Sequence, residues 1–237
     1  MLKIKNLTKQ YGEFKAVDDL TLEIPSGSIY GFIGHNGAGK TTTLKSIAGL
    51  LPIEQGNITV DNISLENNAL EVKKIIAYLP DNPDLYEYLS GAAYLNFIGD
   101  VFGISAKDRE ERIHKYADMF ELTKDLAQPI SSYSHGMKQK LAIISAFIHQ
   151  PKLLLMDEPF VGLDPKTSKE LKELMREFCD QGNAIFFSTH VLEVAEKLCD
   201  HIAIIKKGKL VVSGKTQEVI GNESLEDFFL DIGDDNA

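Results

Sequence analysis

Three short runs in the second half of the chain consist almost entirely of apolar residues. They cover residues 153–156, 184–188 and 202–205, and segments with apolar residues at helical spacing lie between them. Continuous apolar runs are typical of parallel strands that are covered on both faces, with helices as the crossover connections. Together with a similar run at residues 29–33, they predict an α/β core with a mostly parallel sheet.

Shorter strand-like runs lie near the N-terminus, at residues 2–7, 16–20, 22–24 and 58–60. Turn-forming residues such as Pro25 and Gly27 interrupt this part of the chain. Short strands bounded by turn signals favour hairpin-like pairing. We therefore expect an N-terminal antiparallel β layer beside the core.

Residues 86–150 contain no strand pattern and instead repeat apolar residues at helical spacing. The repeated positions are Leu95, Ile98 and Phe102, then Ile113, Tyr116 and Phe120, then Met137, Leu141, Ile144 and Ile148. Such a segment predicts an all-helical insert within the α/β core.

These patterns predict a single domain over residues 1–237. The core takes residues 1–85 and 151–220, the helical insert takes residues 86–150, and an acidic tail takes residues 221–237. We expect the tail to be a frayed, solvated end because it is rich in acidic residues and contains no base.

The charge balance excludes one class of partner. The formal net charge is −10, and six acidic residues fall within the last 15 positions, which leaves −4 on the rest of the chain. Nucleic-acid binding needs a basic face, so we expect no nucleic-acid partner. No run of about 18 apolar residues is present, and residues 1–6 lack the apolar core of a signal peptide. We therefore expect no membrane span and no secretion.

A glycine-rich segment directly follows the apolar run at 29–33 and completes the pattern G-x-x-x-x-G-K-[ST]. Glycines in such a loop let backbone amides turn inward around a phosphate at the start of a helix. Lys40 would neutralise the β and γ phosphates, and the Thr41 hydroxyl would bind Mg²⁺. The nucleotide-binding residues expected here are Gly34, His35, Asn36, Gly37, Ala38, Gly39, Lys40, Thr41 and Thr42.

The run at 153–156 ends in two acidic residues, Asp157 and Glu158. Neighbouring residues on a strand point to opposite sides, so the two carboxylates must serve different purposes. Asp157 would face the Mg²⁺ held by Thr41. Glu158 would face the γ phosphate, where a carboxylate can orient or deprotonate the attacking water.

With these two elements in place, the chain resembles the ATP-binding cassette (ABC) ATPases over nearly all of its length. The other matching residues are Ser134 and Gly136 of the signature motif, which flank His135, then Asp164 of the D-loop, the switch histidine His190, and Tyr11, where the family places an aromatic ring against adenine. The resemblance implies the P-loop NTPase core of an ABC ATPase, with ATP and Mg²⁺ as cofactors. It also implies a head-to-tail dimer, with this chain itself or a homologous subunit, in which each signature contacts the ATP of the opposing subunit.

The chain departs from the family pattern at three positions. His135 and Met137 stand where the signature usually has glycine and glutamine, and Asp81 stands where the family has a glutamine after a strand. Asp81 is a candidate both for accepting a proton from water and for approaching Mg²⁺. The motifs around Asp81 and Met137 are similar to the branch that serves bacterial exporters of drugs and antimicrobial peptides.

The resemblance implies a Mg²⁺-dependent ATPase that powers a separate transmembrane permease, and we expect this permease to be an exporter. The chain would then be cytoplasmic and peripheral, held at the inner face of the membrane by the permease. The alternative is a non-transport ABC ATPase acting in translation or DNA repair. Long coiled coils, a second cassette or a basic face would favour that alternative, and the sequence has none of these. A GTPase would need an N-K-x-D motif to bind guanine, and the sequence contains none.

By the same resemblance, the permease contact lies in a groove around residues 81–86 and the start of the helical insert. We expect Pro83, Leu85 and Tyr86 to be exposed there and to receive a short helix of the partner.

Overall fold

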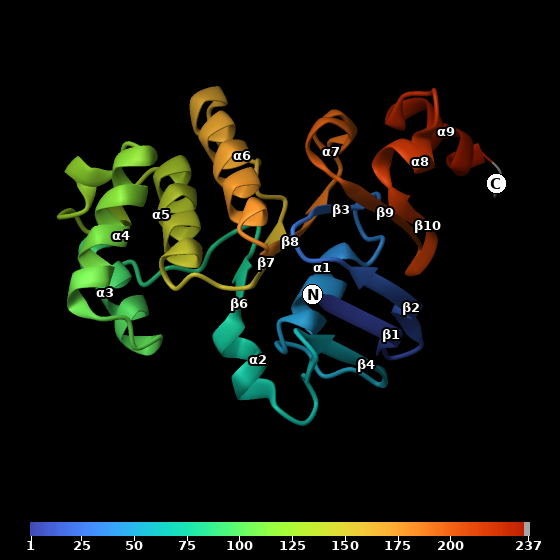
Figure 1. Cartoon of the computed structure of the whole chain (residues 1–237), viewed down its shortest axis with the longest axis horizontal. Coiled ribbons are helices and arrows are strands. Elements are labelled where there is room, and N and C mark those ends of the chain that lie inside the picture. The colour runs from blue at the N-terminus through green and yellow to red at the C-terminus, as the bar shows by residue number, and fades with distance from the viewer. Residues whose placement is uncertain (235–237) are drawn as a thin grey trace.

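Two β-sheets and the helices around them make up the computed structural model, which describes residues 1–234 (Figure 1). The larger sheet has the strand order β10-β9-β3-β8-β7-β6. Its strands are β3 (Ile29–Ile33), β6 (Ile76–Leu79), β7 (Leu153–Asp157), β8 (Ala184–Thr189), β9 (His201–Lys206) and β10 (Lys209–Lys215). All neighbours from β9 to β6 pair in parallel, which confirms the predicted α/β core.

Strand β10 pairs antiparallel with β9 at one edge of this sheet, and the sequence did not predict it. Its residues alternate between exposed and half-buried instead of forming an apolar run. An edge strand that faces water on one side lacks the continuous apolar signal of the inner strands.

The second sheet is the predicted antiparallel layer. It has the order β2-β1-β4-β5, with β1 (Leu2–Tyr11), β2 (Phe14–Ile24), β4 (Gln55–Val60) and β5 (Ile63–Ser64), and every pairing in it is antiparallel. The two runs at 16–20 and 22–24 belong to the single strand β2. Thr21, which separated them in the sequence, is simply a solvent-facing residue of that strand.

The segment between β6 and β7 is helical, as predicted. It contains α3 (Gly91–Val101), α4 (Ala106–Met119), the 3₁₀ turns η1 (Thr123–Asp125) and η2 (Ile130–Ser132), and α5 (His135–Ile148). The other helices are α1 (Lys40–Ile47), α2 (Ala69–Ile75), α6 (Pro165–Asp180), α7 (Leu192–Leu198), α8 (Thr216–Ile220) and α9 (Leu225–Asp234). Helices α3, α4 and α5 gather on the side of the molecule away from β1 and β2 (Figure 1). Within residues 1–234, no helix is both long and apolar enough to cross a membrane.

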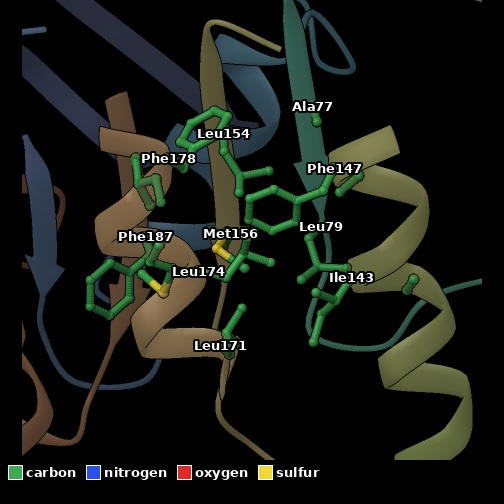
Figure 2. Packing of buried hydrophobic residues seen from close by; sticks show 14 of the residues in the cluster. Ala77, Leu79, Ile143, Phe147, Leu154, Met156, Leu171, Leu174, Phe178 and Phe187 are labelled. Atoms are coloured by element: carbon green, nitrogen blue, oxygen red, sulfur yellow. The ribbon is translucent and has the colours of Figure 1, made fainter. Parts of the chain in front are cut away.

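Side chains that alternate along β7 belong to two separate cores. Leu154 and Met156 lie in the cluster beneath α5 and α6, whereas Leu153 and Leu155 lie in the cluster shared with α1 and the antiparallel sheet. Phe147 of α5 and side chains of α6 lie in the same cluster, and Figure 2 shows them next to Leu154 and Met156 of β7. The sheet therefore supports the insert through α5 and the phosphate-loop helix through its opposite face.

The expectation that Leu85 is exposed was wrong. Leu85 retains 7% of its accessible surface and belongs to the core cluster beneath α5, whereas Tyr86 is 46% exposed and Pro83 is half-buried. The apolar side chain anchors the segment between β6 and α3, because burying it removes hydrocarbon surface from water. The exposed surface of this segment is therefore formed by Tyr86 and, in part, by Pro83.

The expectation of a frayed tail was also wrong for most of its length. Residues 225–234 form α9, whose Leu225 is fully buried and whose Phe228, Phe229 and Ile232 pack on the core. The backbone amide of Leu225 donates to Glu196 Oε2 of α7 over 2.8 Å. Asp235, also assigned to the tail, lies outside the described residues.

This packing predicts that two leucines of α9 differ sharply in importance. Replacing Leu225 with alanine should lower the free energy of unfolding by about 2 to 5 kcal/mol, because the side chain is fully buried. The matched variant Leu230→Ala should change it by less than about 0.5 kcal/mol, because Leu230 is 60% exposed. Urea unfolding of both variants measures the difference. Equal effects would mean that α9 does not pack on the core in solution.

Candidate functional site

The loop between β3 and α1 packs closely against β2, and a glycine makes this close packing possible. Gly39, the residue before α1, has a φ of 109°, and a Cβ on it would lie 2.3 Å from the carbonyl oxygen of Ala16. A side chain would therefore clash and would also strain the backbone. The loop can close onto β2 only because glycine stands at this position, and α1 then begins with its N-terminus facing the loop. A helix N-terminus with free amides favours an anion.

Lys40 lies across this loop and is almost fully buried. Its ammonium group donates to the carbonyl oxygens of Gly34 and His35 at 2.6 and 3.3 Å, and it lies 3.6 Å from Glu158 Oε1. The amide of Ala38 also donates to His35, at 3.1 Å. The lysine thus joins the phosphate loop to the carboxylate at the end of β7.

Asp157 is buried at the carboxyl end of β7 and binds two hydroxyl groups. Thr41 Oγ1 on α1 donates to its Oδ2 over 2.6 Å, and Ser188 Oγ on β8 donates to its Oδ1 in a short hydrogen bond. Burying a carboxylate is costly unless hydrogen bonds satisfy it. The sequence did not single out Ser188, although it directly precedes the Thr189-His190 pair.

Glu158 lies just beyond the strand. Its φ of 48° is unusual for a residue with a side chain, and its amide donates to both the carbonyl and the hydroxyl oxygen of Ser188. Its Oε2 lies 3.0 Å from His190 Nδ1. The two carboxylates do point to different partners, as expected, but the cause is a turn at Glu158 and not strand alternation.

These groups surround a cavity of about 330 Å³. Its lining residues are Tyr11, Phe14, Ala16, Asn36, Gly37, Gly39, Lys40, Thr41, Thr42, Asp81, Asp157 and Glu158. Tyr11 and Phe14 are 50% and 63% exposed and stand at the end of the cavity formed by β1 and β2. The sequence analysis missed Phe14, although its aromatic ring three residues after Tyr11 across a Gly12 turn was a usable signal.

Three residues of the predicted phosphate loop lie outside this lining, namely Gly34, His35 and Ala38. Gly34 and His35 contribute carbonyl oxygens to Lys40. The His35 ring contacts Phe229 of α9 edge-on, with 4.9 Å between ring centroids. The phosphate loop is therefore supported in part by the C-terminal helix.

The signature residues do not line the cavity of their own chain. Ser134 caps α5, with its Oγ accepting from the amide of Met137 at 3.3 Å. Helical geometry leaves the amides of His135 and Gly136 without intrahelical acceptors, and the first turn of α5 contains no acidic residue. The start of α5 is thus a second candidate anion site, separated from the first.

Asp164 acts locally at the start of α6. Its carboxylate accepts from the amide and the hydroxyl of Thr167, at 2.9 and 2.6 Å, and these bonds lower the pKa of Asp164 to about 2. It also lies 3.6 Å from Lys140 Nζ of α5. Its expected contact with nucleotide stays a prediction.

The oxygen groups at the cavity fit a magnesium ion. Mg²⁺ in nucleotide sites is held by one or two carboxylates, a hydroxyl group and the phosphates themselves. Thr41 and Asp157 are already in contact, and Asp81 is exposed in the same lining. The Asp81 Oδ1 accepts from the amide of Asn82 at 2.8 Å, which leaves its other oxygen free to turn toward the cavity.

The comparisons with known proteins agree with this geometry. Residues 17–161 match the family model described as ABC transporter. The bacitracin transport ATP-binding protein BcrA of Bacillus licheniformis is 37% identical over 212 residues, which cover 89% of this chain and 68% of that protein.

Two solved structures are also similar. The structure of an ATP-binding subunit of an ABC transporter superposes with a TM-score of 0.94 at 32% identity, covering 98% of this chain and 99% of that one. A dimeric, post-hydrolysis ATP-binding cassette bound to ADP and Pi gives a TM-score of 0.83 at 25% identity, covering 91% of this chain and 99% of that one.

The position of Glu158 predicts a specific defect in turnover. Glu158→Gln should lower the ATP turnover rate by at least about 100-fold, because the amide keeps the shape but cannot act as a base. ATP affinity should stay within about twofold, since the phosphate loop is unchanged. Steady-state turnover and titration calorimetry measure the two quantities. The exposed Glu71, paired with Lys74 on α2, provides the control variant Glu71→Gln. A Glu158→Gln enzyme that turns over like the control would rule out the role of Glu158.

Proposed function

The chain belongs to the ABC transporter family as an ATP-binding, ATP-hydrolysing subunit, and we propose that it drives a separate membrane permease that acts as an exporter. One observation carries the proposal. Residues of the phosphate loop line a single cavity together with the buried Asp157 and Glu158, and His190 lies 3.0 Å from Glu158. These are the parts that phosphoryl transfer to water requires.

In this proposal ATP lies along the cavity from its aromatic end to its acidic end. The rings of Tyr11 and Phe14 stack on adenine, since exposed aromatic side chains suit the flat face of a base. The phosphates lie over the loop before α1, where the helix N-terminus and the ammonium group of Lys40 favour negative charge.

Thr41, Asp157 and Asp81 are proposed to hold Mg²⁺. The bound ion would neutralise charge on the β and γ phosphates. Asp157 also fixes the Thr41 hydroxyl at the metal position, because its second oxygen is anchored by Ser188. The Asp157 carboxylate is thereby oriented before any ligand binds.

Glu158 is proposed to orient and deprotonate the attacking water. His190 Nδ1 lies 3.0 Å from Oε2, and the ammonium group of Lys40 lies 3.6 Å from Oε1. Glu158 retains only 15% of its side-chain surface, so both partners act at short range in a site with little competing water. His190 is thus a positioning partner of the base.

Hydrolysis is proposed to need a second subunit. Ser134, His135 and Gly136 would bind the γ phosphate held by the opposing chain in a head-to-tail dimer. Support comes from the free amides at the start of α5, which their own cavity does not use. The similar cassette bound to ADP and Pi is dimeric.

The permease is proposed to dock on an aromatic patch formed by Tyr86, Tyr88, Tyr94 and Phe97. The Tyr86 ring lies 6.0, 6.2 and 5.6 Å from the other three rings, and Tyr88 is 80% exposed. Large exposed aromatic side chains are common anchors in protein interfaces. The patch adjoins Asp81 in sequence and sits at the start of the insert, where a short helix of the permease would contact both parts of the chain.

These placements put the chain at the cytoplasmic face of the membrane, attached through the permease. An exporter is favoured because the Nod factor export ATP-binding protein I of Cupriavidus metallidurans is 33% identical to this chain over 223 residues.

The docking surface is tested by changing the patch without touching the cavity. Tyr88→Asp combined with Phe97→Asp should abolish co-purification with the permease, because a charge replaces each exposed ring. The ATP affinity of the isolated chain should stay within about twofold, since no cavity residue is changed. Leu230→Asp, an exposed leucine on α9, is the control and should still co-purify. A patch variant that remains bound to the membrane protein would contradict the placement.

A further inference from the structure

The imidazole ring of His135 lies directly over Gly162 of the same chain. A Cβ on Gly162 would be 2.7 Å from Cδ2 and 2.8 Å from Nε2 of that ring. His135 is the first residue of α5, whereas Gly162 lies in the loop between β7 and α6. One side chain of the insert therefore rests on the loop that follows Glu158.

This loop is a hydrogen-bonded unit that begins at Glu158. The amide of Val161 donates to the Glu158 carbonyl at 3.1 Å, and the amide of Leu163 donates to the Phe160 carbonyl at 3.4 Å. The next residue, Asp164, caps α6. Because these hydrogen bonds join the loop residues, a displacement of Gly162 would also displace Glu158.

Glu158 is sensitive to such a displacement because of its own backbone. Its φ of 48° is an unfavourable value for a residue with a Cβ, and such conformations persist only where the surroundings enforce them. On the core side the loop is braced by Phe160, whose ring meets Phe187 edge-on at 6.0 Å. On the insert side the brace is His135.

Two ion pairs also join the insert to the region after the loop. Lys140 lies 3.6 Å from Asp164, and Lys166 of α6 pairs with Glu121. In both pairs at least one side chain is largely exposed, and exposed pairs contribute little to stability. The insert also approaches this loop at Gly136, where a Cβ would lie 3.5 Å from the carbonyl oxygen of Gly162. The start of α5 is therefore a direct steric link between the insert and the loop after Glu158.

We propose that His135 is a positioning residue for Glu158 in its own chain, acting through the contact of its ring with Gly162. Movement of the insert then changes the placement of the base, and the signature of one subunit acts on two sites. It serves the opposing nucleotide through its amides and its own Glu158 through this ring. The inference rests on the proposed role of Glu158.

A double-mutant cycle in the full chain without nucleotide tests the contact. In the wild-type background, the new methyl group of Gly162→Ala clashes with the His135 ring, and alanine also strains the backbone at a positive φ (79°). In the His135→Gly background only the backbone strain remains. The unfolding constant should therefore rise at least about fivefold more in the first background, as expected for residues in contact. Effects that add within about twofold would overturn the contact.

Steady-state kinetics test the positioning role. His135→Gly should lower kcat by about threefold to tenfold with KM for ATP unchanged, because small displacements of a catalytic group cost rate. His135→Phe should restore kcat, since the ring and not its nitrogen atoms makes the contact. A raised KM with normal kcat, or a failure of phenylalanine to rescue, would overturn the proposal in favour of a direct contact with the opposing nucleotide. Full turnover of Glu158→Gln would instead refute the proposed base and leave the stability cycle unaffected.

Discussion

The Asp157 carboxylate is the group on which the rest of the site depends, since it binds two hydroxyls from different elements. Thr41 brings the first turn of α1 to the end of β7, and Ser188 brings the end of β8. The side chain is 1% exposed, so losing either bond would leave a buried charge poorly satisfied. This constraint fixes the phosphate loop relative to the strand that ends in Glu158, and Ser188 also receives the amide of Glu158. One polar network therefore positions Thr41, Asp157 and Glu158 together with the phosphate loop.

Much of this arrangement could be predicted because the signals are local. The inner parallel strands are buried on both faces and appear as apolar runs, and the phosphate loop needs glycine wherever its backbone approaches Ala16. The turn at Glu158 was not predictable, because its φ is set by hydrogen bonds to Ser188 on another strand.

The errors have physical causes too. Leu85 was expected at the surface because the family resemblance implies a partner groove around residues 81–86, but its burial depends on the cluster beneath α5, to which distant elements contribute. The C-terminal segment was judged by its acidic composition. Its apolar residues Leu225, Phe228, Phe229 and Ile232 nevertheless recur at helical spacing, which was the signal for α9. Phe229 of that helix contacts the ring of His35, so α9 supports the phosphate loop.

The central claim is that each chain holds only half of a working ATP site, with the phosphate loop in one chain and the start of α5 in the other. The most direct measurement is the mass of the Glu158→Gln variant by light scattering, with and without ATP and Mg²⁺. The account predicts a single chain of 26.3 kDa without nucleotide and twice that mass with it, because ATP joins two complementary anion sites. A variant that binds ATP and remains at the mass of one chain would contradict the account.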